Sequence, residues 1–497
     1  MQKKFMGSPK KPLHLVWFKR DLRTADHPAL ARALKTGPTI GLFIFETEWL
    51  QADEFAPCHL QFAWECLHEL RVDLAKKGIP LILRTGSAVS VLQNLHREHP
   101  LAGIYSHQET GLDWSYRRDL AVKEWCQTQS VPWREFKSFG VVRKLKDRST
   151  WPEKRARIIG RSEERVGGQQ TFTSPWPEIT EPLPTPEHHL LKPGAQKGGR
   201  SSGLSLMQSF FDERGQHYSG SISSPNSAEE GCSRLSPHLA WGTLSLTEVH
   251  HELERKRSSL HGLAQPGKWL RSLEQFESRL WWHCHFIQKL ESQPSIEFNN
   301  MNREFDGMRE NEFDEGRFEA WCRGETGFPM IDACMRALQL NGWINFRMRA
   351  MLLSFATYQL WLHWRKPAIF LARHFIDFEP GIHYSQVQMQ AGVTGINTLR
   401  VYSPKKQLLD QDPKGVFVRR YLPELSAVPI SDLAEPHVMP PLLQLGSGFQ
   451  AGVHYPLPIV DPEESYRRAK ERIFEWKNRP EVRKAAQKVL QRHSARN

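Results

Sequence analysis

The first third of the chain alternates short apolar runs with stretches of helical periodicity. Between two of the runs, apolar residues recur every three or four positions from Leu60 to Leu74, which predicts a helix. Alternating strands and helices indicate a parallel sheet that is covered on both faces. The apolar runs, each of which predicts a buried strand, are Leu13 to Phe18, Thr39 to Phe45, Pro80 to Arg84 and Ala102 to Tyr105.

The pattern changes twice further along the chain. Between about residues 166 and 203, Pro, Gly, Thr and Ser dominate without sustained periodicity, which is typical of a connector. Beyond about residue 205 strand signals almost vanish, while helical periodicity and tryptophan become frequent. We therefore predict an α/β domain with a doubly wound parallel sheet at residues 1–160, a connector at 161–204, and a large all-α domain at 205–497.

Composition narrows the class of protein. The 497 residues include 67 Lys and Arg against 55 Asp and Glu, a net charge of +12. Such an excess can attract nucleic acid, although an evenly solvated basic surface would have the same composition. No apolar run approaches the roughly 20 residues that cross a bilayer, and Met1 to Pro12 lacks the pattern of a secretory signal. We expect a cytoplasmic protein that does not bind membranes.

The cysteines argue against disulfides and metal binding. All 7 are scattered, and none forms a C-x-x-C pair. We expect reduced thiols and no metal site.

Four segments together resemble one known family. They are similar, in the same order, to segments of photolyases and cryptochromes, flavoproteins that hold FAD in a helical domain and use blue light to move electrons. The resemblance implies FAD as the cofactor of the all-α domain. The segments are Leu15–Leu30 (LVWFKRDLRTADHPAL), Gly231–Ser245 (GCSRLSPHLAWGTLS), Phe318–Ala333 (FEAWCRGETGFPMIDA) and Asp412–Leu425 (DPKGVFVRRYLPEL).

The second segment implies the site of the FAD diphosphate. Small hydroxyls beside backbone amides at a helix entry can donate to phosphate oxygens, although an ordinary helix cap would look the same. Cys232 replaces the threonine that is usual in the family and removes one donor. The residues that the resemblance implies here are Tyr218, Ser233, Arg234, Leu235 and Ser236.

Arginines and acids imply the flavin side of the site. Trp343 to Arg349 is similar to the helix whose arginines face the flavin, here Arg347 and Arg349. Arg349 could stabilise reduced flavin, because a buried anion needs positive charge nearby. Counting from Trp364 places the acidic pair at Asp377 and Glu379, with Asp377 as the expected partner of Arg349; a structural ion pair is the alternative.

The residues after the acidic pair depart from the family. The same count places His383 beside flavin N5, where it could donate a proton or a hydrogen bond near neutral pH; Tyr384 and Gly381 are alternatives, and a lone histidine is more often structural.

The usual electron route of three tryptophans is broken. Only Trp364 matches, while Val387 and Asn311 take the other places. Trp361 and Trp343 could supply another route, although core packing is the more common role of a tryptophan.

Two further sites follow from the resemblance. In the helix that would line a lesion pocket, acids could meet a pyrimidine edge and tryptophans could stack on a flipped base, or the aromatics could pack into the core. A second chromophore, a pterin or a deazaflavin, could lie at the strand ends near His107, Gln108 and Glu109. The lesion-pocket candidates are Glu274, Glu277, Trp281 and Trp282.

Three functions remain open. The leading hypothesis is a photolyase, a monomer in which light-excited FAD donates an electron to a pyrimidine dimer in DNA and splits it. The alternative is a cryptochrome-type blue-light photoreceptor without repair activity, which the poor match in the lesion pocket favours. A binder of nucleic acid that keeps only the scaffold is the third.

Overall fold

The computed structural model describes residues 12–180, 182–187, 191–261 and 267–494, and it begins with a five-stranded parallel sheet. The strand order is β3-β2-β1-β4-β5. Strands β2 and β3 therefore lie on one side of β1, and β4 and β5 lie on the other. The strands are β1 (Leu13–Phe18), β2 (Thr39–Phe45), β3 (Leu81–Thr85), β4 (Leu101–His107) and β5 (Trp133–Phe136).

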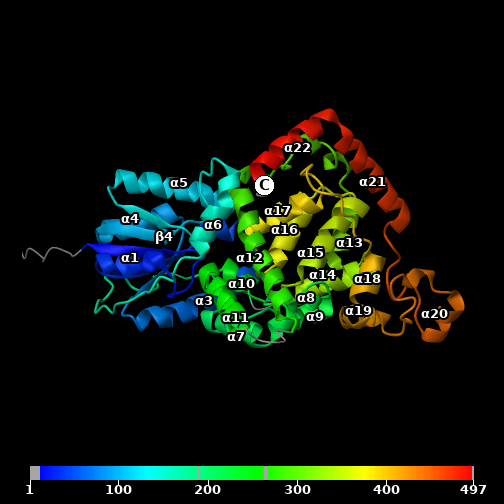
Figure 1. Ribbon diagram of the computed structural model, residues 1–497, viewed down its shortest axis with the longest axis horizontal. Coiled ribbons are helices and arrows are strands. Elements are labelled where there is room, and N and C mark those ends of the chain that lie inside the picture. The colour runs from blue at the N-terminus through cyan, green and yellow to red at the C-terminus, as the bar shows by residue number, and fades with distance from the viewer. Residues whose placement is uncertain (1–11, 181, 188–190, 262–266, 495–497) are drawn as a thin grey trace, which may run out of the picture.

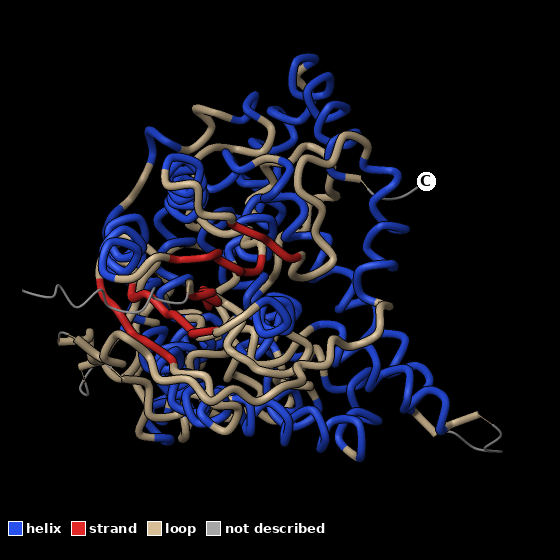
Figure 2. Tube along the Cα trace, turned by 90° about the vertical axis from the view of Figure 1, so that its left-hand side faces the viewer, coloured by secondary structure: helices blue, strands red, loops and turns tan. Residues whose placement is uncertain are grey.

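Helices cover both faces of this sheet (Figure 2). Every residue of β1 and β2 is buried, which explains why these strands read as unbroken apolar runs. The predicted strands are confirmed to within two residues at each end, but β5 was missed because it is a four-residue edge strand with no apolar run. The helices of this part are α1 (Pro28–Thr36), α2 (Thr47–Leu50), α3 (Pro57–Ala75), α4 (Ala88–Glu98), α5 (Asp113–Thr128) and α6 (Trp151–Ile159).

The rest of the chain is helical from residue 200 onward (Figure 1). None of its described helices is both long and apolar enough to cross a membrane. The helices are α7 (Arg200–Asp212), α8 (Tyr218–Ser221), α9 (Pro225–Gly231), α10 (Ser236–Ala240), α11 (Leu246–Ser259), α12 (Trp269–Ser292), α13 (Glu315–Arg323), α14 (Pro329–Asn341), α15 (Phe346–Ser354), α16 (Arg365–His374), α17 (Pro380–Gln390), α18 (Pro404–Gln411), α19 (Val416–Tyr421), α20 (Pro441–Ser447), α21 (Pro462–Asn478) and α22 (Pro480–His493).

Between the two parts, the chain lies along the sheet rather than hanging free. The described residues from 161 to 199 form no helix or strand, yet Ile179 bridges to Leu83 and the Gln170 side chain bonds the backbone of Thr39. These contacts order the segment, although its sequence has neither helical nor strand periodicity.

The loop after β1 joins the sheet to the helices. Leu22 N–H donates to the Trp241 carbonyl at 3.1 Å, and Arg23 donates to the Gly242 carbonyl at 2.9 Å. A Cβ on Gly242 would lie 2.2 Å from the carbonyl oxygen of Arg20, and its φ of +65° is one that glycine tolerates best. The motif that follows the first strand therefore holds the two parts of the molecule together.

Candidate functional site

A bidentate ion pair lies just before the N-terminus of α17. Arg349 of α15 donates through Nη1 and Nη2 to the two carboxylate oxygens of Asp377, both at 2.9 Å. Its Nε donates to the Ile344 carbonyl, and the guanidinium lies 4.1 Å from the centre of the Phe375 ring. The structure thus brings together the arginine and the acid that the count from Trp364 had paired. The Asp377 side chain is 3% exposed and the Arg349 side chain is 22% exposed, so solvent screens one side of this pair.

Glu379, two residues further on, faces the sheet. Its carboxylate is buried and lies 3.9 Å from Arg20 Nη1. Burial raises the pKa of Glu379 to about 7, and the Arg20 guanidinium opposes that rise. Arg20 also donates to the carbonyls of Ala240 and Phe378, so one side chain of the first loop contacts the segment that carries both acids.

His383 donates one hydrogen bond in this structure. Its Nε2 lies 2.9 Å from the Ala368 carbonyl oxygen, which accepts only if Nε2 carries the proton, so Nδ1 has a free lone pair. Burial lowers the pKa of His383 to about 4. A pKa this low disfavours transfer of a proton from His383 near neutral pH, although the Asp377 carboxylate opposes the shift. The position of His383 beside flavin N5 stays a prediction.

The serine-rich segment is a tight turn before α10. Arg234 adopts φ +61°, and its backbone and side chain are held by paired hydrogen bonds to Gln196. Ser233 Oγ accepts weakly from the Leu235 N–H at 3.4 Å. The Leu235 side chain is buried in the core, whereas Ser236 is exposed. Tyr218 is buried on the neighbouring α8, and Arg279 of α12 hydrogen-bonds its side chain.

Buried polar atoms without partners indicate that this region holds a polar ligand. Both amide atoms of Gln386 are buried and unbonded, and so are Gln275 Oε1, Asn345 Oδ1 and Arg347 Nε. Gln386 follows His383 by three residues on α17 and shares its face. A flavin ring edge, which carries alternating donors and acceptors, could satisfy an amide, and the arginines and Tyr218 suit a diphosphate. The residues present fit FAD.

Sequence reasoning missed Gln386, Gln275 and Arg279. Helical spacing from His383 could have found the first of these. The other two lie on the predicted lesion-pocket helix, but their facing partners come from segments far away in sequence.

The lesion-pocket candidates do not converge. Glu274 is exposed, and Glu277 forms an ion pair with Arg257 of α11 at 2.6 Å. Trp281 packs against Trp151 and His285, which is a core arrangement. Trp282 differs, because Arg279 covers its ring at 4.2 Å.

The candidate electron carriers have different surroundings. Trp364 is fully buried, donates to Asn300 and lies 6.3 Å, centre to centre, from the ring of Tyr384. The rings of Tyr384 and His383 are 5.3 Å apart. Trp361 lies between two guanidinium groups, and Trp343 lies 3.9 Å from the Arg234 guanidinium.

The strand ends form a crevice where a second ligand could bind. It measures about 650 Å³, including its part open to solvent, and lies beside the residues that follow β1 and β2. Glu109 lines both this crevice and a smaller one of about 530 Å³ that His107 and Gln108 also line. Aromatic and charged side chains both line the larger crevice. The Trp and Phe residues are Phe43, Trp49, Trp114, Trp241 and Phe378, and the charged residues are Lys19, Arg20, Glu46, Glu109 and Arg118.

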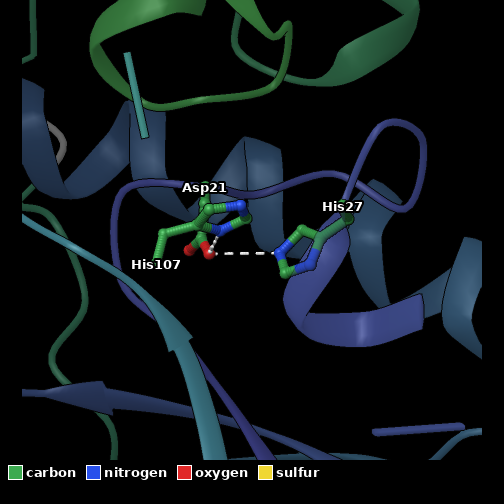
Figure 3. A group of neighbouring side chains, drawn as sticks. All are labelled: Asp21, His27 and His107. Atoms are coloured by element: carbon green, nitrogen blue, oxygen red, sulfur yellow. Dashed lines mark hydrogen bonds and ion pairs between the residues drawn. The ribbon is translucent and has the colours of Figure 1, made fainter. Parts of the chain in front are cut away.

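Asp21, His27 and His107 lie together (Figure 3), and two of them, Asp21 and His107, line the smaller crevice. Asp21 Oδ2 lies 3.1 Å from His27 Nε2 and 2.6 Å from His107 Nδ1. His27 Nδ1 accepts from the Leu30 N–H, so Nε2 carries the proton toward Asp21. The pKa of both histidines is lowered, chiefly by burial. We interpret the group as a carboxylate holding two neutral imidazoles in place, a structural role.

Comparisons with known proteins point to one family. A family model described as DNA photolyase matches residues 14–163, and one described as the FAD binding domain of DNA photolyase matches residues 276–475. A deoxyribodipyrimidine photo-lyase of Streptomyces griseus is 30% identical, over 91% of this chain and 97% of that protein. A cryptochrome DASH of Gloeobacter violaceus is 28% identical, over 90% and 93%. The crystal structure of a class III photolyase from Agrobacterium tumefaciens superimposes with a TM-score of 0.81 at 25% identity, covering 96% of this chain and all of that one.

The buried Glu379 predicts a pH dependence of stability. Its folded pKa of about 7 exceeds the ordinary value of 4.5, so the folded chain holds this proton more tightly than the unfolded chain. The protonated Glu379 therefore adds to the free energy of unfolding at low pH. This contribution is lost as the pH rises toward 7. Since a ten-fold change in proton affinity corresponds to about 1.4 kcal/mol, the loss is about 3 kcal/mol.

Denaturant unfolding of wild type and Glu379→Gln across this pH range measures the effect. The fall in unfolding free energy should be about 3 kcal/mol smaller in the variant, in which this group cannot titrate. Glu319→Gln, whose side chain is 59% exposed, serves as the control and should follow wild type. Parallel curves for wild type and Glu379→Gln would contradict the assignment.

Proposed function

Because this chain belongs to the photolyase and cryptochrome family and carries its FAD-binding domain, we propose that it is a photolyase that repairs pyrimidine dimers in DNA. When bound, FAD supplies an electron to the dimer under blue light. The chain's own residues bind the cofactor, hold its surroundings in place and present DNA to it.

An exposed aromatic residue next to an arginine supports the proposal that DNA is the substrate. Phe346, at the start of α15, is 44% exposed although it is a large aromatic residue, and it precedes Arg347, whose Nε has no partner. Arg349 of the same helix holds Asp377. An exposed ring and a guanidinium beside the cofactor site can stack on a base and pair with a phosphate. Stacking on a base is the role that the sequence analysis had assigned to Trp281 and Trp282.

The second candidate is a photoreceptor. It is favoured by the contact between Glu379 and Arg20, which links the cofactor side of α17 to the loop after β1. A change of charge on the cofactor would alter the protonation of this glutamate, whose pKa is about 7, and could shift the contact between the two parts.

We propose that Trp364 and Tyr384 carry electrons toward the cofactor. Their rings are neighbours, and the Tyr384 hydroxyl donates to the buried carboxylate of Glu54. That carboxylate can take the phenol proton when Tyr384 is oxidised, so no charge is left on the ring. Trp361 is a poorer donor, because the guanidinium groups of Arg309 and Arg472 oppose a positive charge on its indole.

We also propose that the larger crevice at the strand ends binds a second, light-collecting chromophore with a flat aromatic ring. Its support is the aromatic lining, with Arg118 lying 5.4 Å from the ring of Trp114.

The repair assay tests the first proposal. Illuminated reduced protein should restore thymine in dimer-containing single- or double-stranded DNA, and Phe346→Ala should weaken binding of that DNA by about ten-fold while flavin content stays constant. Phe298→Ala is the matched control, because Phe298 is 41% exposed and also lies near an arginine, Arg365. Bound FAD without any repair would favour the photoreceptor.

The electron route is tested by light-driven bleaching of flavin absorbance. Trp364→Phe and Tyr384→Phe should each slow the bleaching at least about ten-fold. The first variant removes an oxidisable indole, and the second removes the hydroxyl whose proton Glu54 would accept. Trp361→Phe and Trp343→Phe should change the bleaching rate less than about two-fold. Equal slowing in all four variants would reject the route.

The second chromophore is tested by the absorption spectrum of the purified protein. An absorption band beyond that of FAD should be present, and Trp114→Ala should remove it without loss of FAD, because the ring supplies stacking area in the crevice. Retention of the band in this variant would place the chromophore elsewhere.

A further inference from the structure

Three basic side chains meet where the last helix packs against the body of the chain. Arg148 comes from the turn before α6, Lys289 from the end of α12, and His493 from the end of α22. They are 6%, 4% and 1% exposed. Figure 1 shows the C-terminal end of α22 beside α12 and near α6. Each of the three belongs to a different segment, so only the tertiary fold brings them together.

No carboxylate accompanies these groups among the described residues. Lys289 Nζ has only the sulfur of Met389, 3.9 Å away, as a polar neighbour. Arg148 uses Nη2 for His285, while its Nε and Nη1 are buried without partners. His493 Nε2 lies 2.7 Å from Gln293 Oε1, and its Nδ1 has no partner. Donors therefore remain unused on at least two of the three segments.

The charges of the cluster repel one another. Burial, and then the charge of Arg148, lower the pKa of Lys289 to about 8, and burial lowers the pKa of Arg148 to about 10. Both side chains still carry charge at neutral pH, and an unpaired buried charge costs several kcal/mol. An anion bound among them would remove that cost and would use the free donors.

We propose that Arg148 and Lys289, with His493 beside them, form a binding site for one small oxyanion of the phosphate type. Unused donors that come from two segments, Nε and Nη1 of Arg148 and Nζ of Lys289, suit an anion with oxygens on several sides better than a planar carboxylate, which one arginine edge can satisfy. The burial of all three groups excludes the backbone of duplex DNA as the ligand. The bound anion would join α22 to α12 and would stabilise the C-terminal helix; the proposal does not depend on the repair function.

The experiment uses the full-length protein with its FAD and inorganic phosphate as the probe. Thermal unfolding and calorimetric titration are run at constant ionic strength, with sodium chloride as the reference salt. Phosphate should raise the unfolding temperature of wild type and bind with a stoichiometry of one. Lys289→Met should weaken binding by at least about ten-fold.

The matched control is Lys123→Met, which removes the same charge from an exposed position on α5. It should keep the wild-type response to phosphate. Without phosphate, Lys289→Met should unfold at the wild-type temperature or above it, because it removes an unpaired buried charge. Arg148→Gln provides a second variant should Lys289→Met not fold, and it should also weaken binding, because it removes the unused donors Nε and Nη1.

A parallel titration with adenosine monophosphate separates two sources of the oxyanion. Saturable binding of either probe that is lost in Lys289→Met supports the site, and the tighter probe identifies whether the anion is free or carried by a nucleotide. The proposal is overturned if phosphate and chloride stabilise wild type equally, or if Lys289→Met responds to phosphate as wild type does.

Discussion

The arrangement of the helical part depends on the paired hydrogen bonds between Arg349 and Asp377. They tie α15 to the short segment before α17, and that segment sets where α17 begins. From this start, helical spacing places His383 and Gln386 on one face and Tyr384 beside Trp364. A buried pair of this kind adds little net stability, but it tolerates few other geometries, which is what a site for a large cofactor requires.

The same segment couples the two parts of the molecule. Asp377 faces α15, whereas Glu379 faces Arg20 in the loop after β1. Arg20 donates to the Phe378 carbonyl between the two acids, so the sheet and the helices meet at the residues that border the cofactor. A crevice lined by Trp114, Arg20 and Phe378 lies at this junction, which explains why both proposed ligands would be close to one another.

Departures from the family at the site leave the fold unchanged. The residue predicted beside flavin N5 is a histidine that stays neutral because burial lowers its pKa to about 4. The tryptophan route is shortened, and a tyrosine with its own carboxylate acceptor lies next to Trp364. Trp364, Tyr384 and Val387 all belong to the apolar core of the helical part, so the core is filled at these positions.

The amino-acid sequence by itself determined the alternation of strands and helices, the change to an all-helical second part, and the order of segments that identifies the family. The resemblance to that family, anchored at Trp364, also implied the pairing of Arg349 with Asp377. Only the tertiary structure shows that Glu277 is already paired with Arg257. It alone also shows that the Gln386 amide and two nitrogens of Arg148, Nε and Nη1, are buried without hydrogen-bond partners. Desolvation and pairing depend on neighbours that are distant in sequence, and a periodic pattern contains no information about them.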